Sequence, residues 1–133
     1  MPTLKITAAE MVAAAKSRIR ELSSEEGIAL LGRPDVVIVD LRDPRERDRE
    51  GIIPGSFHCP RGMLEFWIDP QSPYFKPVFA DEKTFVFHCA SGWRSALSVA
   101  TLQDMGFEAA HLADGFSGWK AAGGPVEFPQ RKS

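Results

Sequence analysis

The stretch that decides the fold is His88-Cys89-Ala90-Ser91-Gly92-Trp93-Arg94-Ser95. It follows Thr84-Phe85-Val86-Phe87, a short apolar segment that predicts a buried strand. Downstream, Val99, Leu102 and Met105 recur at helical spacing, and Gly106 ends the pattern as a C-terminal cap does. The sequence therefore predicts a strand, a loop of small residues and a helix, with a cysteine where the strand ends.

This arrangement favours a reactive thiol. Loop N–H groups and the positive end of the helix dipole stabilise a thiolate, and Arg94 adds a permanent charge with forked donors. A lone cysteine is equally well explained as a small core residue, but the Gly, Ser and Arg-Ser around this one favour chemistry. We predict that Cys89 is catalytic and that substrate is bound by the residues after it, namely Ala90, Ser91, Gly92, Trp93, Arg94 and Ser95.

Composition narrows the class of protein. The chain has 133 residues, 44% of them hydrophobic, and a formal net charge of −2, which suits one α/β-sized domain over residues 1–133 and does not suggest a nucleic-acid or membrane partner. No apolar run approaches a membrane span, and charges interrupt the apolar stretch near the N-terminus, so we expect no signal peptide. Two cysteines without CxxC spacing favour a reducing, cytoplasmic setting.

Alternating elements are expected along the chain. Capping boxes at Thr7/Glu10 and Ser23/Glu26 predict helices over about 8–22 and 24–31, a helical lead-in over about 8–32. Further strands are expected at 36–39, 56–59 and 109–112, and further helices at 62–68 and 116–122, with 43–50 a solvated helix or loop. Such alternation predicts a parallel sheet with helices on both faces, in which Asp40 and Cys89 share the ligand-binding edge.

A resemblance to a known family rests on several motifs in order. These are Asp40-Leu41-Arg42-Asp43-Pro44-x-Glu46, then Gly51-Ile52-Ile53-Pro54-Gly55-Ser56, the Cys89 loop, and Asp114-Gly115-Phe116-x-x-Trp119-x-x-x-Gly123. Together they resemble the rhodanese (sulfurtransferase) family over about residues 36–127. The resemblance implies a rhodanese-like α/β fold, a five-stranded parallel sheet with helices on both faces. It also implies transfer of a sulfane sulfur through a persulfide on Cys89.

The chain departs from the family pattern at two positions. Ile52 stands where the family usually has a His, and Asp114 stands where it usually has a second Gly. Neither departure touches the cysteine loop, so the implied chemistry is kept.

The implied reaction uses a small donor, thiosulfate or 3-mercaptopyruvate, and a thiol, protein or cyanide acceptor. It requires no metal and no organic cofactor, and three singly placed histidines do not predict a metal site. Cys59 lacks a small-residue loop and is expected to be dispensable. Arg42 and Arg61 are candidate pocket contributors, although an ion-pair network with Asp40 and Glu46 explains Arg42 more simply, and 45–50 is expected to be a solvated face.

Two alternatives stay open. Cysteine-dependent phosphatases and arsenate reductases place five residues between Cys and Arg, whereas Cys89 and Arg94 are separated by four, a tighter ring that favours sulfur over a tetrahedral oxyanion. A redox-sensing or interaction domain would instead use Cys89, with or without Cys59, as a regulatory thiol.

Overall fold

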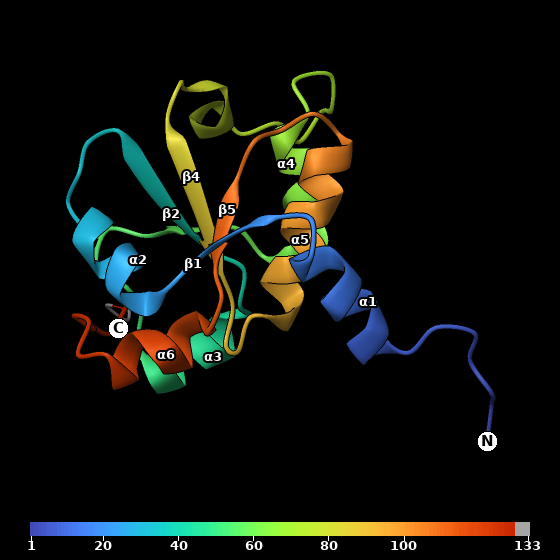
Figure 1. The fold of residues 1–133 in the computed structure, drawn as a ribbon. Coiled ribbons are helices and arrows are strands. Elements are labelled where there is room, and N and C mark those ends of the chain that lie inside the picture. Colours follow the sequence, from blue (N-terminus) through green and yellow to red (C-terminus); the bar gives the residue numbers. More distant parts are fainter. Residues whose placement is uncertain (130–133) are drawn as a thin grey trace.

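The computed structural model describes residues 1–129 and is built on one five-stranded sheet (Figure 1). The strand order is β1-β5-β4-β2-β3, and every neighbouring pair is parallel. The strands are β1 (Arg20–Leu22), β2 (Val36–Asp40), β3 (Phe57–His58), β4 (Thr84–His88) and β5 (Ala110–Leu112). The five-stranded parallel sheet expected from the sequence is confirmed.

Helices cover both faces of the sheet, as alternating strands and helices require. On one face lie α1 (Ala8–Lys16), α4 (Leu64–Ile68) and α5 (Trp93–Asp104), and on the other α2 (Ser24–Leu30) and α6 (Gly115–Ala121) (Figure 1). Helix α3 (Pro44–Glu50) reaches α6 through an ion pair between Glu50 and Lys120. Two 3₁₀ turns, Arg61–Met63 and Pro77–Ala80, flank α4 along the chain.

Side-chain alternation along the strands creates two apolar cores. Val39 and Phe87 belong to the cluster beneath α4 and α5, whereas Ile38 and Val86 belong to the cluster beneath α2 and α6. Period-two geometry places neighbouring residues of a strand on opposite faces, so an unbroken apolar strand supplies both clusters. Trp119 is fully buried in the second cluster, and its indole N–H donates to the Pro125 carbonyl at 2.8 Å.

The first predicted helix is too long. Both capping boxes are present, but α1 ends at Lys16, and residues 20–22 form β1 instead. Arg20 to Leu22 pair in register with Ala110 to Leu112, so pairing with the edge of the sheet outweighs local helical spacing. This segment is the fifth strand, which the strand pattern of the sequence did not locate.

The charged segment after β2 forms a helix with a third capping box. Asp43 accepts from the Arg45 and Glu46 N–H groups, and Glu46 reaches back to the Asp43 N–H. The expectation of a solvated face over 45–50 is wrong for Glu46 and Arg47, whose side chains are 18% and 16% exposed and form ion pairs toward the sheet. The residues that remain exposed are Arg45, Asp48 and Arg49.

The carboxyl ends of β2 and β4 meet at one edge. Asp40 and His88 are register partners, so Asp40 and the neighbouring Cys89 end adjacent strands, as the sequence predicts. Within residues 1–129, no helix combines the length and apolar character needed to cross a membrane.

Candidate active site

The Cys89 loop joins β4 to α5 through four residues of backbone. Gly92 has φ +96° and serves as the N-cap of α5, which begins at Trp93. A side chain at Gly92 would collide with the Ala113 carbonyl oxygen, so the residue must be glycine for two reasons. Gly115 has φ +61°, and a Cβ there would lie 2.6 Å from the Ala90 oxygen.

Helix α6 holds the other side of the loop. The Phe116 N–H donates to the Cys89 carbonyl at 2.8 Å, and the Ser117 N–H donates to the Ala90 carbonyl at 3.1 Å. The first turn of α6 thus fixes two carbonyls of the loop.

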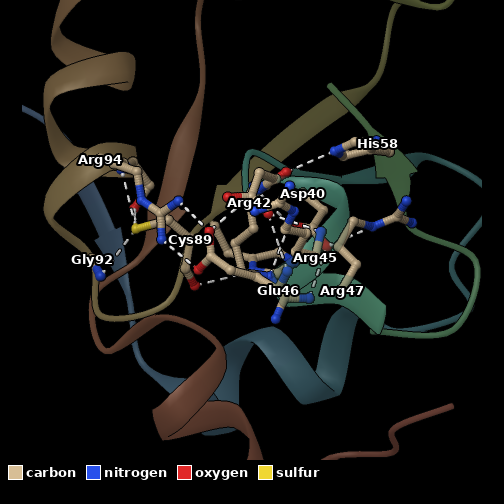
Figure 2. A network of polar contacts seen from close by, with 12 residues as sticks. Asp40, Arg42, Arg45, Glu46, Arg47, His58, Cys89, Gly92 and Arg94 are labelled. Atoms are coloured by element: carbon tan, nitrogen blue, oxygen red, sulfur yellow. Dashed lines mark hydrogen bonds and ion pairs between the residues drawn. The ribbon is translucent and has the colours of Figure 1, made fainter. Parts of the chain in front are cut away.

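The Cys89 sulfur is enclosed by hydrogen-bond donors (Figure 2). The Gly92 N–H donates to Sγ at 3.2 Å and the Ser95 N–H at 3.4 Å, while the Ser95 hydroxyl lies 3.6 Å from Sγ. Cys89 is only 1% exposed. The sequence predicts that the loop residues from Ala90 to Arg94 bind substrate through their N–H groups. Of these described residues, only Gly92 donates its N–H to the sulfur. The second amide comes from the first turn of α5.

Ser95 links the sulfur to two groups that the sequence did not predict. Its hydroxyl lies 2.7 Å from Nδ1 of His111, and Nε2 of His111 lies 2.8 Å from a carboxylate oxygen of Glu21. His111 is fully buried in β5, and Glu21 is its register partner in β1. In the sequence His111 is only one of three singly placed histidines, so these contacts were not predicted. A signal was available, because His111 alternates with the apolar Ala110 and Leu112 and so faces α5.

Asp40 anchors a second polar cluster. Arg42 donates to both carboxylate oxygens of Asp40 at 3.0 and 2.9 Å, and Arg47 donates to one of them at 3.1 Å (Figure 2). Burial raises the pKa of Asp40, but the Arg42 hydrogen bonds and nearby positive charge outweigh it and hold that pKa below the usual carboxyl value. Arg42 is 1% exposed, also donates to the Gly51 carbonyl at 2.8 Å, and lies 4.1 Å over the Phe116 ring.

The Arg94 guanidinium is bonded to a side chain of α3. Its two terminal nitrogens donate to the two oxygens of Glu46 at 2.7 and 2.8 Å (Figure 2). These hydrogen bonds lower the pKa of Glu46 and raise that of Arg94. Any donor molecule that uses the guanidinium must therefore share it with Glu46 or displace that carboxylate.

A cleft of about 390 Å³ opens beside the loop. It is lined by Arg42, Glu46, Arg49, Glu50, Ala90, Phe116, Ser117 and Lys120, so α3 and α6 form its walls. A larger cavity of about 530 Å³ lies at the amino ends of β4 and β5, around Thr84 and Ala110. We place the candidate site in the smaller cleft because it includes a residue of the cysteine loop.

The remaining predicted residues divide into two groups. Arg42 lines the cleft, whereas Trp93, the first residue of α5, is 50% exposed and does not line it. Arg61 does not line it and instead pairs with Glu65 at 2.8 Å. Within the described part of the chain, no group of three or more His, Cys, Asp or Glu residues could hold a metal ion.

Comparison with known proteins connects this geometry to a family. The Rhodanese-like domain family model matches residues 23–122. A thiosulfate sulfurtransferase GlpE from Pseudoalteromonas translucida is 30% identical, with 77% of this chain and 90% of that protein covered. A dual specificity phosphatase Cdc25 from Arabidopsis thaliana is 32% identical, with 81% and 77% covered.

A solved structure is considerably more similar. A protein of unknown function from Rhodopseudomonas palustris, described as a possible tyrosine phosphatase, is 56% identical, covers 96% of this chain and 99% of its own, and superposes with a TM-score of 0.91. The relatives thus include proteins named for sulfur transfer and proteins named for phosphate chemistry. The match over residues 23–122 and the cysteine loop at the carboxyl edge of the sheet show that this chain belongs to the rhodanese-like domain family.

Proposed function

We propose that this protein is a sulfurtransferase that carries a sulfane sulfur as a persulfide on Cys89. The observation that carries the proposal is the enclosure of Sγ. Two amides reach it at 3.2 and 3.4 Å within a loop that leaves four residues between Cys89 and Arg94. Such amides stabilise an anionic sulfur, both as thiolate and as persulfide.

The reaction balances without a metal or redox cofactor. The Cys89 thiolate attacks the outer sulfur of thiosulfate, a sulfur–sulfur bond forms on Cys89, and the sulfur–sulfur bond of the donor breaks. The electron pair leaves with sulfite, and the negative charge of the nucleophile remains on the persulfide. An acceptor such as cyanide or a thiolate then removes the outer sulfur and restores Cys89.

Cleft charge suits an anionic donor. Arg42, Arg49 and Lys120 line the cleft, and Arg94 stands at its loop side, although Glu46 and Glu50 offset part of this charge. 3-Mercaptopyruvate carries one carboxylate and thiosulfate two negative charges, so both are candidate donors, and protein or low-molecular-weight thiols are candidate acceptors.

Phosphatase activity is the competing proposal, favoured by the names of two relatives. In this chain the Gly92 and Ser95 amides are bonded to the Cys89 sulfur. Both terminal nitrogens of Arg94, which a phosphate would need, are bonded to Glu46. We therefore expect sulfur transfer and no hydrolysis of aryl phosphates.

The test compares three substrates on one preparation of the protein. Thiosulfate and 3-mercaptopyruvate are each supplied with cyanide, and thiocyanate formation is measured beside hydrolysis of para-nitrophenyl phosphate. We expect thiocyanate from at least one donor, and a cyanide-reversible gain of one sulfur mass on the peptide that contains Cys89. Robust phosphate release without any persulfide would overturn the proposal.

A further inference from the structure

An unbroken line of polar contacts runs from the buried sulfur to the far edge of the sheet. It passes from Cys89 Sγ to the Ser95 hydroxyl at 3.6 Å, to His111 Nδ1 at 2.7 Å, and from His111 Nε2 to Glu21 at 2.8 Å. Cys89, Ser95 and His111 are each at most 1% exposed, whereas the Glu21 side chain is 33% exposed. The line therefore begins in the protein interior and ends at solvent.

The fold explains why these groups meet. His111 and Glu21 are register partners in neighbouring parallel strands, so their side chains project from the same face. That face is covered by α5, whose first turn presents Ser95. A histidine in this position of β5 therefore meets the helix that begins at the cysteine loop.

Hydrogen-bond direction restricts the protonation states along this line. When Nε2 donates to the Glu21 carboxylate and the ring is neutral, Nδ1 must accept the Ser95 proton. The Ser95 oxygen then accepts from the Cys89 thiol. When Cys89 is a thiolate, the Ser95 hydroxyl must turn to donate to sulfur, and Nδ1 then meets a lone pair unless it carries a proton.

We propose that Cys89 and His111 share one proton through Ser95, so that thiolate formation is coupled to formation of an imidazolium held by Glu21. As the S–H bond breaks, its proton passes to the Ser95 oxygen and the Ser95 proton passes to Nδ1. The electron pair stays on sulfur, and no group is oxidised or reduced. The proton remains on His111 while the sulfur is anionic, as thiolate or as persulfide.

The groups around the ring hold the pKa of His111 below its usual value, so the ring is neutral while Cys89 is a thiol. Burial lowers the pKa of His111, opposed by the hydrogen bond and charge of Glu21 and assisted by the charge of Lys16. Lys16, from the last turn of α1, lies 3.7 Å from Glu21, and Phe87 of β4 is the apolar register partner on the other side. In the described part of the chain these are the charged groups that act on the ring, and a thiolate two hydrogen bonds away favours its protonated form. Because His111 acts through Ser95, it is a positioning residue.

The inference rests on the proposed function only for the reason why Cys89 must be anionic. Its test does not require turnover of a sulfur donor. Iodoacetamide alkylation of Cys89, located by peptide mass, is followed against pH in wild type, His111→Gln and Glu21→Gln. We expect His111→Gln to move the midpoint of the alkylation profile upward by about one pH unit, and Glu21→Gln by about half a unit. Glu25→Gln, an exposed glutamate in α2, serves as the matched control and should leave the profile in place.

A second measurement reports the proton itself. The ¹⁵N resonances of the His111 ring are followed against pH in wild type and in Cys89→Ser. We expect Nδ1 in wild type to stay protonated over the pH range in which the ultraviolet absorbance of the thiolate is present, and to lose its proton at a lower pH in Cys89→Ser.

Superimposable alkylation profiles for wild type and both variants, or an identical ring titration with and without the thiol, would overturn the inference. If His111→Gln does not fold, the Glu21→Gln profile and the ring titration still decide it. Coupling without turnover of any sulfur donor would reject the proposed function while leaving the inference intact. Turnover of a sulfur donor without this coupling would support the proposed function and reject the inference.

Discussion

The molecule contains two His-Cys pairs at strand ends, and only one of them is surrounded by donors. His58-Cys59 follows β3 and His88-Cys89 follows β4, and both cysteines are buried. The sulfur of Cys89 receives two backbone N–H groups, whereas among the described residues the thiol of Cys59 has only the Pro60 carbonyl, at 3.8 Å, as a hydrogen-bond partner.

The difference begins with the residue after each cysteine. Pro60 has no N–H to offer and leads into a 3₁₀ turn, so Cys59 packs into the apolar cluster with Leu64 and Phe79. Burial raises the pKa of Cys59 to about 12, with the charge of Arg61 only partly opposing it. A strand end does not by itself activate a thiol. Amides that converge on the sulfur do so.

Replacing each thiol in turn gives the largest expected effect. Cys89→Ser should lower thiocyanate formation at least about 1000-fold, because a serine hydroxyl is a far weaker nucleophile for sulfur at neutral pH. Cys59→Ala should keep turnover within about twofold, at a stability cost of roughly 1–2 kcal/mol because a buried sulfur is removed from the apolar cluster. Steady-state assays and urea unfolding of both variants check this. If Cys59→Ala abolishes turnover while the protein stays folded, the contrast between the two sites is wrong.

The histidines before the two cysteines provide the next contrast. Burial lowers the pKa of His88 to about 4, although the Asp40 carboxylate opposes this, and no hydrogen-bond partner for His88 Nε2 occurs among the described residues. The native state therefore binds fewer protons than the unfolded state between about pH 4 and 6.5. Stability must fall as the pH is lowered through this window, by roughly 3 kcal/mol at pH 4.

The measurement is the free energy of urea unfolding at pH 7 and pH 4. The advantage of wild type over His88→Gln should shrink by roughly 3 kcal/mol between these conditions, since glutamine does not titrate. His58→Gln is the control, because the His58 ring is only half-buried and bonded to the Arg42 carbonyl at 2.7 Å. If the stability difference between wild type and His88→Gln does not depend on pH, burial does not lower the pKa of His88 and the prediction is wrong.

Much of the fold could be predicted from the sequence because its signals are local. The capping boxes at Thr7 and Ser23, the apolar run of β2 and the loop after β4 each lie within a few residues. Strand β1 could not be predicted in this way, because its three residues carry no apolar alternation and are a strand only through pairing with β5. The role of Glu21 was hidden for the same reason.

The site was predictable only where its residues are neighbours in sequence. Cys89, Gly92 and Ser95 come from one motif, and the structure brings them together. The partner of Arg94 is Glu46, 48 residues away, and that of Ser95 is His111, across a strand crossover. No spacing rule connects these pairs. Only the order of strands in the sheet does so.

The arginines that follow the two cysteines give the smallest and most discriminating contrast. Each pairs with a glutamate, Arg94 with Glu46 at 2.7 Å and Arg61 with Glu65 at 2.8 Å, but only Glu46 lines the cleft. Arg94→Ala should therefore weaken kcat/KM for thiosulfate by about 1.5–3 kcal/mol, the scale of one charged hydrogen bond, and Arg94→Lys should recover part of it because an ammonium lacks the fork.

Arg61→Ala is the matched control for charge and should change kcat/KM by no more than about twofold, because an exposed ion pair of this kind contributes about 0–1 kcal/mol. Kinetics with thiosulfate at two salt concentrations separate direct binding from long-range attraction. If the Arg94 guanidinium binds the donor directly, the deficit of Arg94→Ala persists in high salt, whereas an effect of net charge alone fades and is equal in both variants. Equal, salt-sensitive deficits for Arg94→Ala and Arg61→Ala would therefore mean that Glu46 keeps Arg94 from the donor, and that the Cys89 loop recognises it through backbone amides alone.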